Sequence, residues 1–205
     1  YIDCSNYENC LHFMTPIVLD YTVNKRNWGL QGNDRDYAAP HGAFRCKGED
    51  RWCVISISSD EEWHTFCELI GRPELAEDPR FLTIQARRQN HEELEKMITA
   101  WTEERTAHEV MTLLQGGRIA SGVVQNCEDL FKDPQVAHRN YFKVLDHAEM
   151  GEHPYLSTSY ILSDTPSDIR SSAPLLGEHN EFVLKELLGL SEEEYVEALL
   201  SGLFT

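Results

Sequence analysis

The polar side chains best suited to binding a ligand gather in one segment of the chain, residues 29–41. Loops that are long and polar, and that adjoin a structural boundary, often cover ligands. A plain connector between two elements is the alternative interpretation. The segment predicts a substrate-binding loop made of Gly32, Asn33, Asp34, Arg35 and His41.

Side chains that serve metal or nucleophilic chemistry are scattered elsewhere in the sequence. It contains no G-x-G-x-x-G, P-loop, H-E-x-x-H or G-x-S-x-G motif. His147 and His153 flank Gly151 and could share a metal ion, but a polar loop accounts for them as well. Cys46 and Cys53 lie on opposite arms of an expected hairpin, as a cross-strand disulfide or, more commonly, as small buried thiols. No base lies beside either thiol in the sequence, so we expect no nucleophilic cysteine and no metal site.

Acidic residues dominate the charged positions. The chain has 205 residues, with 35 Asp and Glu against 18 Lys and Arg, which gives a net charge of −17 at pH 7. This balance argues against a nucleic-acid partner, which needs a basic face, and against docking on an anionic membrane. Glutamate clusters at 92–95, 103–104 and 192–194 fall in or beside expected helices, where we interpret them as solvated faces.

The cellular location is inferred from three features of the sequence. No apolar run approaches the roughly 18 residues of a membrane-spanning helix. Six cysteines without a C-x-x-C pair favour the reducing cytoplasm over an oxidising compartment. The chain begins with Tyr1, inside a structured-looking pattern, so we expect a fragment or a processed chain.

Helix starts are marked by four capping boxes, in which a hydroxyl and a carboxylate three residues later satisfy free amides. Apolar spacing predicts a helix after each box, the last at 192–200, and further helices at 90–101 and 182–188. Pro16 should bend the first helix. The boxes are Ser5–Glu8, Ser59–Glu62, Thr106–Glu109 and Ser191–Glu194.

Strands are fewer, and the clearest are 43–47 and 52–57, on either side of the turn Gly48-Glu49-Asp50. The β-branched and aromatic residues on both sides of the turn indicate a hairpin. Further candidate strands are 123–124, 142–145 and 157–162. We therefore expect a small α+β domain with a short antiparallel sheet at residues 37–145, between outer segments at 1–36 and 146–205. Two ends of a chain that bracket an inserted domain would give this pattern.

Seven short motifs follow one another along nearly the whole chain. They are Ile2–Ser5, Ala39–Gly48, Gly71–Leu75, Asp78–Phe81, Ile119–Val124, Asp133–Val136 and Ala173–His179. In this order they resemble the class III CoA-transferase family, also called CaiB/BaiF-like. The family includes formyl-CoA and carnitine CoA-transferases, and α-methylacyl-CoA racemases form a sister branch. Each motif is weak alone, but their order is specific.

The resemblance implies a Rossmann-like α/β large domain, built from both ends of a full-length chain, with the small domain inserted between them. Two chains would interlock as linked rings in a homodimer. The substrates would be an acyl-CoA and a small carboxylic acid, with coenzyme A as a substrate and no covalently bound cofactor. An aspartate in the N-terminal half, which this chain lacks, would attack the thioester and form an aspartyl–acyl anhydride. We therefore expect the catalytic residue, and most contacts to CoA, outside these 205 residues.

Two departures from the family's pattern bear on the reaction. Formyl-CoA transferases carry a run of glycines in the loop that closes over the active site, whereas Gly32-Asn33-Asp34-Arg35-Asp36 contains no such run, which disfavours formate and oxalate as the substrate pair. The racemases usually carry a catalytic glutamate near the residues that match Ala39–Gly48. No acid lies between Asp36 and Glu49 here, so the sequence favours a transferase over a racemase. A non-catalytic acidic interaction domain is a third hypothesis, for which the net charge is the only argument.

Overall fold

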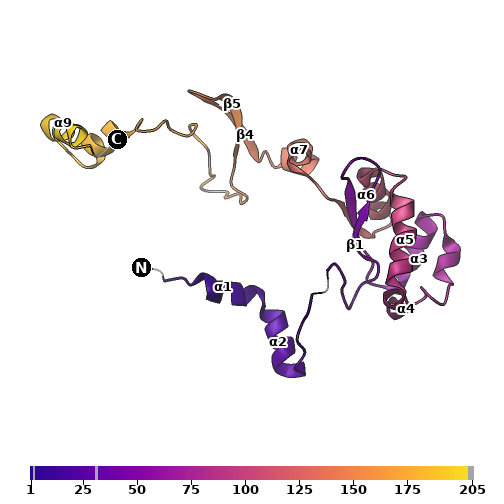
Figure 1. Cartoon of the computed structure of the whole chain (residues 1–205). Coiled ribbons are helices and arrows are strands. Elements are labelled where there is room, and N and C mark those ends of the chain that lie inside the picture. The colour runs from indigo at the N-terminus through magenta and orange to yellow at the C-terminus, as the bar shows by residue number, and fades with distance from the viewer. Residues whose placement is uncertain (2, 31, 203–205) are drawn as a thin grey trace. The chain divides into compact units, whose positions relative to one another are not determined.

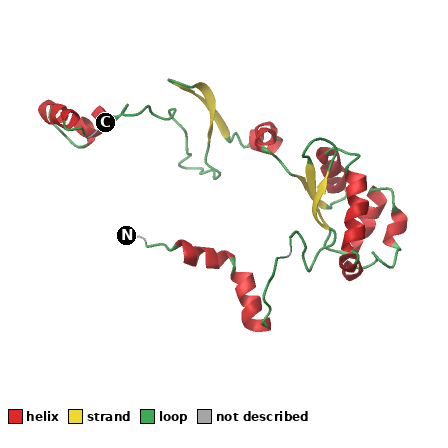
Figure 2. Ribbon diagram, in the orientation of Figure 1, coloured by secondary structure: helices red, strands yellow, loops and turns green. Residues whose placement is uncertain are grey.

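The computed structural model describes residues 1, 3–30 and 32–202, so Ile2 of the first motif lies outside this part. Its contacts divide the chain into two units, Tyr1–Val124 and Gln125–Thr205. Each unit contains both helices and short strands (Figure 1, Figure 2). Within the described part, no helix is long and apolar enough to cross a membrane.

Two short helices open the first unit. α1 spans Asn6–Phe13 and α2 spans Thr15–Asn24, with Met14 between them. Pro16 stands in the first turn of α2, where its missing N–H costs no helical hydrogen bond. The bend expected at Pro16 takes the form of a break between the two helices. Both helices lie wholly in the described part, and none of their residues is buried.

A three-stranded antiparallel sheet forms the base of the core in this unit. β1 (His41–Arg45) pairs with β2 (Trp52–Ser56), and β2 pairs with β3 (Ala120–Val123). Side chains alternate between the two faces with the period of a strand. Phe44 is buried on the inner face, whereas Val54 is exposed on the outer face. The expected hairpin is therefore confirmed, and the third strand expected at 123–124 is present with its bounds at Ala120–Val123.

Helices cover the inner face of this sheet, where α5 (His91–Thr102) packs on β1 and α6 (Ala107–Gly116) packs on β2 and β3 (Figure 1). The helices and the sheet share one core, and its aromatic members Trp63, Phe66 and Phe81 are 0% exposed. Each such side chain contributes roughly 1.5–3 kcal/mol through burial. The helices expected after Ser59, at 90–101 and after Thr106 are confirmed. The elements between β2 and β3 are α3 (Asp60–Leu69), η1 (Pro73–Ala76), α4 (Ile84–Gln89), α5 (His91–Thr102) and α6 (Ala107–Gly116).

Capping residues fix several helix starts. At Ser59 the hydroxyl accepts the Glu62 amide, as predicted, but the Glu62 carboxylate accepts the Ser58 backbone N–H at 2.6 Å, so the box is not closed in the expected way. At Ser5 the hydroxyl accepts the Glu8 amide. The predicted boxes that form completely are Thr106–Glu109 and Ser191–Glu194.

The second unit begins with two short helices and a hairpin, and it ends with two further helices. The Asn126–Asp129 pair forms a capping box at the start of α7, which the sequence analysis did not predict. η2 has π-helical hydrogen bonding, and together with α9 it confirms the two helices expected near the C-terminus. The elements are α7 (Cys127–Lys132), α8 (Pro134–His138), β4 (Phe142–His147), β5 (Gly151–Leu156), η2 (Phe182–Leu187) and α9 (Glu192–Leu200).

The strand expected at 157–162 is wrong, because β5 occupies 151–156 and pairs there with β4. A tight turn directly after β4 sets this register. His147 Nδ1 accepts the backbone N–H groups of Glu149 and Met150, both at 3.2 Å, and so holds the turn. Gly151 then starts the return strand at φ +70°, a conformation that suits a residue without Cβ.

Helices and two small antiparallel sheets together make a mixed α/β chain, and the expected α+β class is confirmed at that level. The Rossmann-like large domain stays a prediction. The same holds for the domain bounds at 1–36, 37–145 and 146–205.

Candidate functional site

His41 begins β1 and lies opposite Ser56 of β2 in the sheet register. Its Nδ1 lies 2.8 Å from the Ser56 hydroxyl oxygen, so this cross-strand hydrogen bond orients the imidazole and is coupled to its tautomer. The Tyr37 ring approaches His41 edge-on, with ring centroids 6.3 Å apart. The half-buried imidazole is therefore held by neighbours from the loop and from the adjacent strand.

A hollow of about 370 Å³ lies beside His41 on the three-stranded sheet. Ligand pockets begin at roughly 300 Å³, so this volume accommodates a small organic group. Asn33 and Val54 contribute to its lining. Most of the other lining residues have small side chains, which keep the hollow open: Gly42, Ala43, Ser56, Ala120, Ser121 and Gly122.

A second hollow, of about 230 Å³, also borders on His41. Its lining combines buried apolar groups with charged side chains from the loop and from α4 and α5. Such a mixture suits a ligand with both an apolar part and a charged part. The residues are Asp34, Arg35, Ala38, Ala39, Pro40, His41, Arg88, His91, Leu94 and Glu95.

Four of the five predicted loop residues border these two hollows. Asn33 borders the first, Asp34 and Arg35 border the second, and His41 borders both. Gly32 borders neither of the two. The structure thus brings the polar loop and His41 together, and their contact with a substrate stays a prediction.

Ion pairs tie the loop to neighbouring elements. The Asp36 carboxylate pairs with Arg88 of α4 at 2.8 Å and with Arg26 at 3.4 Å. Arg35 Nη1 donates to the Asp34 carbonyl at 2.7 Å, and an isolated bridge joins Arg35 to Ala38. The ion pairs of Asp36 are exposed, so each contributes little free energy, about 0–1 kcal/mol. They favour one course of the loop without fixing it strongly.

Arg87 of α4 is the residue of this region that the sequence analysis missed. Its fully buried guanidinium donates to the Ala39 carbonyl at 2.7 Å and to the Asp60 carboxylate at 2.9 Å. Burial lowers the pKa of the guanidinium, and its hydrogen bond to Asp60 opposes that shift. Nothing in the sequence separates Arg87 from Arg88, which has the same chemistry but is exposed.

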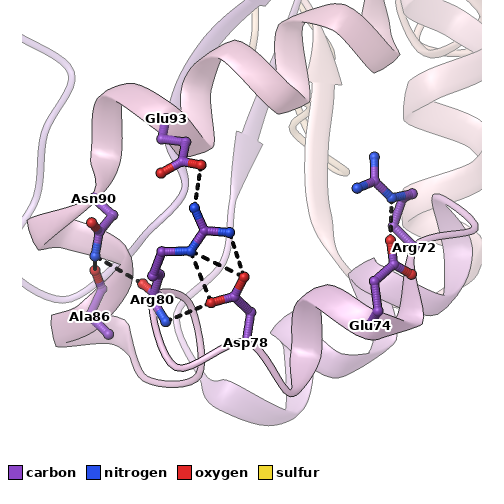
Figure 3. A network of polar contacts seen from close by, with 7 residues as sticks. All are labelled: Arg72, Glu74, Asp78, Arg80, Ala86, Asn90 and Glu93. Carbon is purple, nitrogen blue, oxygen red and sulfur yellow. Dashed lines mark hydrogen bonds and ion pairs between the residues drawn. The ribbon is translucent and has the colours of Figure 1, made fainter.

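The Asp78–Phe81 motif forms a structural turn (Figure 3). The Asp78 carboxylate accepts the Arg80 backbone N–H at 2.9 Å and also binds the Arg80 guanidinium. That guanidinium pairs with Glu93 of α5 as well, and nearby Arg72 pairs with Glu74. The hydrogen bonds from the Arg80 side chain and backbone hold the pKa of the Asp78 carboxyl below its usual range. The motif therefore orders the connection between η1 and α5.

Cys46 and Cys53 are buried free thiols, which is the commoner of the two alternatives considered. Burial raises the pKa of both thiols, so neither is an activated nucleophile. The rings of His147 and His153 lie 5.7 Å apart. Within the described residues, no group of three or more His, Cys, Asp or Glu side chains could hold a metal ion.

The glutamate clusters at 92–95, 103–104 and 192–194 are exposed, as predicted. Two carboxylates border the second hollow, those of Asp34 and Glu95, and both residues are exposed. Among the described residues, no carboxylate is buried. The region around His41 therefore offers hydrogen-bonding and charged groups without a desolvated acid.

The sequence model of CoA-transferase family III matches residues 1–180. The chain belongs to this family. The match confirms the resemblance carried by the seven motifs, and it includes the polar loop, His41 and both hollows.

Curated relatives carry the names of CoA-transferases. A probable CoA-transferase of Mycobacterium tuberculosis is 35% identical over 162 residues, which cover 75% of this chain and 20% of the relative. The formyl-CoA:oxalate CoA-transferase of Streptomyces coelicolor is 34% identical over 164 residues, 80% of this chain and 40% of the relative. The succinyl-CoA–D-citramalate CoA-transferase of Chloroflexus aurantiacus is 28% identical over 193 residues, 94% of this chain and 48% of the relative. The chain spans less than half the length of these three relatives.

A crystal structure of a CaiB/BaiF family protein from Brucella suis is similar to this chain, with a TM-score of 0.75 and 24% identity. The match covers 86% of this chain and 45% of that chain. At this identity the likeness shows the fold alone. It agrees with the mixed α/β arrangement described above.

Proposed function

We propose that the protein transfers CoA between an acyl-CoA and a small carboxylic acid, and that residues 32–41 border the place where the acid binds. The observation that carries this proposal is the family III match across residues 1–180. This substrate class is supported by relatives named for succinyl-CoA and formyl-CoA as donors, and for citramalate and oxalate as acceptors. The transfer assay described below identifies the particular acyl donor and acceptor acid.

The proposed chemistry is nucleophilic catalysis by a carboxylate. An aspartate attacks the thioester carbonyl, the C–S bond breaks, and CoA leaves as a thiolate, which yields an aspartyl–acyl anhydride. The acceptor acid then obtains CoA through further anhydride and thioester steps. We place this aspartate outside the 205 residues of the chain. Two facts support that placement, namely the exposure of Asp34 and the engagement of Asp36 with two arginines.

The two hollows beside His41 suit part of a substrate rather than a whole CoA molecule. The larger holds about 370 Å³, near the lower limit of ligand pockets, which fits a small acid or acyl group. In this proposal Gly32, Asn33, Asp34 and Arg35 form a lid over that group, and His41 contacts the group from the start of β1. Loop closure of this kind excludes water from a reactive acyl intermediate.

The assembly and location complete the proposal. We propose an interlocked homodimer, a cytoplasmic location, and coenzyme A as substrate without a covalently bound cofactor. The six cysteines support the location, since all of them are free in the described chain. The sizing of the full-length protein by light scattering tests the dimer.

A transfer assay with the full-length protein tests the reaction. Succinyl-CoA is incubated with a panel of ¹³C-labelled carboxylic acids, and new labelled acyl-CoA is measured by mass spectrometry. The proposal expects at least one labelled thioester to form at the rate at which succinyl-CoA disappears. Hydrolysis without transfer, for every donor and acid tried, would refute it. Exchange of the α-proton of a 2-methylacyl-CoA in heavy water, without transfer, would establish the racemase alternative instead.

The lid is tested by replacing Asn33 and Asp34 together with Ala. We expect kcat to fall about 10-fold or more, because closure and orientation of the substrate are impaired. Glu103→Ala serves as the control, since it removes the same single charge from an exposed site directly after α5. Unchanged turnover in the double variant would exclude the lid role while leaving the transfer reaction itself intact.

A further inference from the structure

Arg87 carries the most deeply buried charge among the described residues, and its donors reach three separate segments. Nε donates to the Ala39 carbonyl at 2.7 Å, Nη1 to the Phe81 carbonyl at 2.9 Å, and Nη2 to the Asp60 carboxylate at 2.9 Å. The guanidinium carbon lies 5.1 Å from the centre of the Trp63 ring. One side chain therefore joins the loop, the turn before α4 and the start of α3.

The Ala39 carbonyl is the contact that matters for the site. Ala39 and Pro40 lead directly into His41, and all three border the second hollow. The Ala39 N–H donates to the Ile57 carbonyl, and the Ile57 N–H donates to the Pro40 carbonyl, both at 2.9 Å. Those bonds attach the segment to the chain just after β2, and Arg87 holds the remaining backbone acceptor of Ala39 from the side of α4. The backbone before His41 is thus held from two sides.

Core cohesion alone does not account for an arginine at this place. Burying a guanidinium costs free energy, and an apolar side chain of similar volume often fills such a space without loss. The Asp60 side chain is 47% exposed, so water screens its attraction for the buried charge. A guanidinium supplies instead a rigid fork of donors, and here one of them points at the backbone beside the site.

We propose that Arg87 is a positioning residue, which fixes the Ala39–Pro40 backbone and thereby orients His41 between the two hollows. This inference rests on the proposed role of the 32–41 loop in CoA transfer. The Nε bond to Ala39 acts on the site, whereas the bonds from Nη1 and Nη2 hold the arginine itself. A misplacement of about 1 Å at such a site costs up to about 100-fold in rate.

Three substitutions separate the Ala39 bond from the buried charge. In Arg87→Gln the side-chain Nε2 takes the chain position of the arginine Nε, so the donor to Ala39 is kept and the charge is lost. In Arg87→Met a methyl group takes that position, so both are lost. In Arg87→Lys a methylene takes it and the ammonium lies one atom farther, near Asp60, so the charge is kept and the donor is lost.

Two measurements are made on each full-length variant: hydrogen exchange of the peptide that covers residues 33–41, and the kinetics of CoA transfer. We expect exchange at 33–41 to be about 10-fold faster in the Lys and Met variants and within about threefold of the unmodified protein in the Gln variant. We expect kcat to fall about 10- to 100-fold in the same two variants, with KM for the acyl-CoA nearly unchanged. If Arg87 acted only as a structural charge, the order would be reversed: the Lys variant would keep slow exchange and normal kcat, and the Gln variant would lose both.

Equal exchange and equal kcat in the Gln and Met variants would overturn the proposal, and so would full activity in the Lys variant. If one neutral variant fails to fold, the Lys variant still decides, because it keeps the charge pair and lacks the donor to Ala39. If the unmodified protein transfers no CoA, the proposed function fails, and the exchange measurement alone still shows whether Arg87 orders residues 33–41.

Discussion

Replacing Thr102 by Val tests how firmly α5 holds β1, the strand that begins with His41. The Thr102 hydroxyl is 0% exposed and donates to the Arg45 carbonyl at 2.6 Å, across 57 positions of sequence. Valine has nearly the same shape, so the substitution removes this hydrogen bond without opening a cavity. This hydrogen bond is partly buried, and an acceptor shielded from water that loses its partner costs about 1–3 kcal/mol. We therefore expect the core of the first unit to lose about 2 kcal/mol of stability.

Native-state hydrogen exchange measures this loss of stability for the first unit alone, because each amide reports the unfolding of the unit in which it lies. At about 1.4 kcal/mol for each factor of ten, a loss of 2 kcal/mol speeds exchange about 30-fold at amides that open only when this core unfolds. Ile98 of α5 and Phe44 of β1 provide such amides, since both residues are buried.

Thr65→Val is the matched control for this experiment. The Thr65 hydroxyl donates to the Glu61 carbonyl within α3, at 3.1 Å, on a partly exposed face. Its removal leaves no buried carbonyl without a partner, so we expect a change of about 0.5 kcal/mol or less. Exchange that quickens less than about threefold in Thr102→Val, or equally in both variants, would refute the reasoning.

Further predictions concern packing, His41 and the thiols. Gly117→Ala should destabilise the first unit by about 1 kcal/mol, because a Cβ there would meet Leu69 Cδ1 and force that side chain to move. Gly116→Ala, in open space at the end of α6, should instead stabilise it by about 0.5–1 kcal/mol, and urea unfolding compares the two. Ser56→Ala should free the His41 Nδ1 and change its tautomer population, which ¹⁵N chemical shifts of the imidazole report. An unchanged spectrum would contradict the assigned contact. Burial raises the pKa of the Cys67 thiol in α3 from 9.0 to about 12. The contribution of this thiol to the free energy of unfolding is therefore complete below pH 9 and is lost as the pH rises toward 12. With a disulfide reagent at pH 8, three thiols should react quickly and three only after unfolding, and six fast thiols would contradict this division. The slow thiols are Cys46, Cys53 and Cys67.

Local patterns predicted the elements whose signals lie within a few residues. The helix at Glu192–Leu200 has the predicted bounds, because a capping box and apolar spacing agree there. Pro16 marked the break between two helices, and the turn at 48–50 marked the β1–β2 hairpin. The composition of the polar loop also predicted a binding region, and the structure has two hollows beside this loop.

The missed features depend on contacts that spacing does not encode. The β4–β5 register is set by His147, whose ring accepts two backbone amides of the turn, and a histidine in a polar sequence carries no mark of that role. Asn126 and Asp129 cap α7 with side chains that also occur in ordinary loops. The burial of Arg87 follows from the joint arrangement of α3, α4 and the loop, so the sequence of α4 alone could not distinguish it from Arg88.

The core cluster of the first unit draws its fully buried members from one continuous stretch, Phe44 to Ile119. A ribosome making this chain has therefore released every one of them once β3, which ends at Val123, has left the exit tunnel. Domains generally fold as units during synthesis, and small mixed α/β domains fold far faster than the roughly 5–20 residues added each second. The sheet and its helices are thus expected to form while residues 125–205 are still being made. A folding error in the second unit would then arise after the first unit, with His41 and its loop, has already folded.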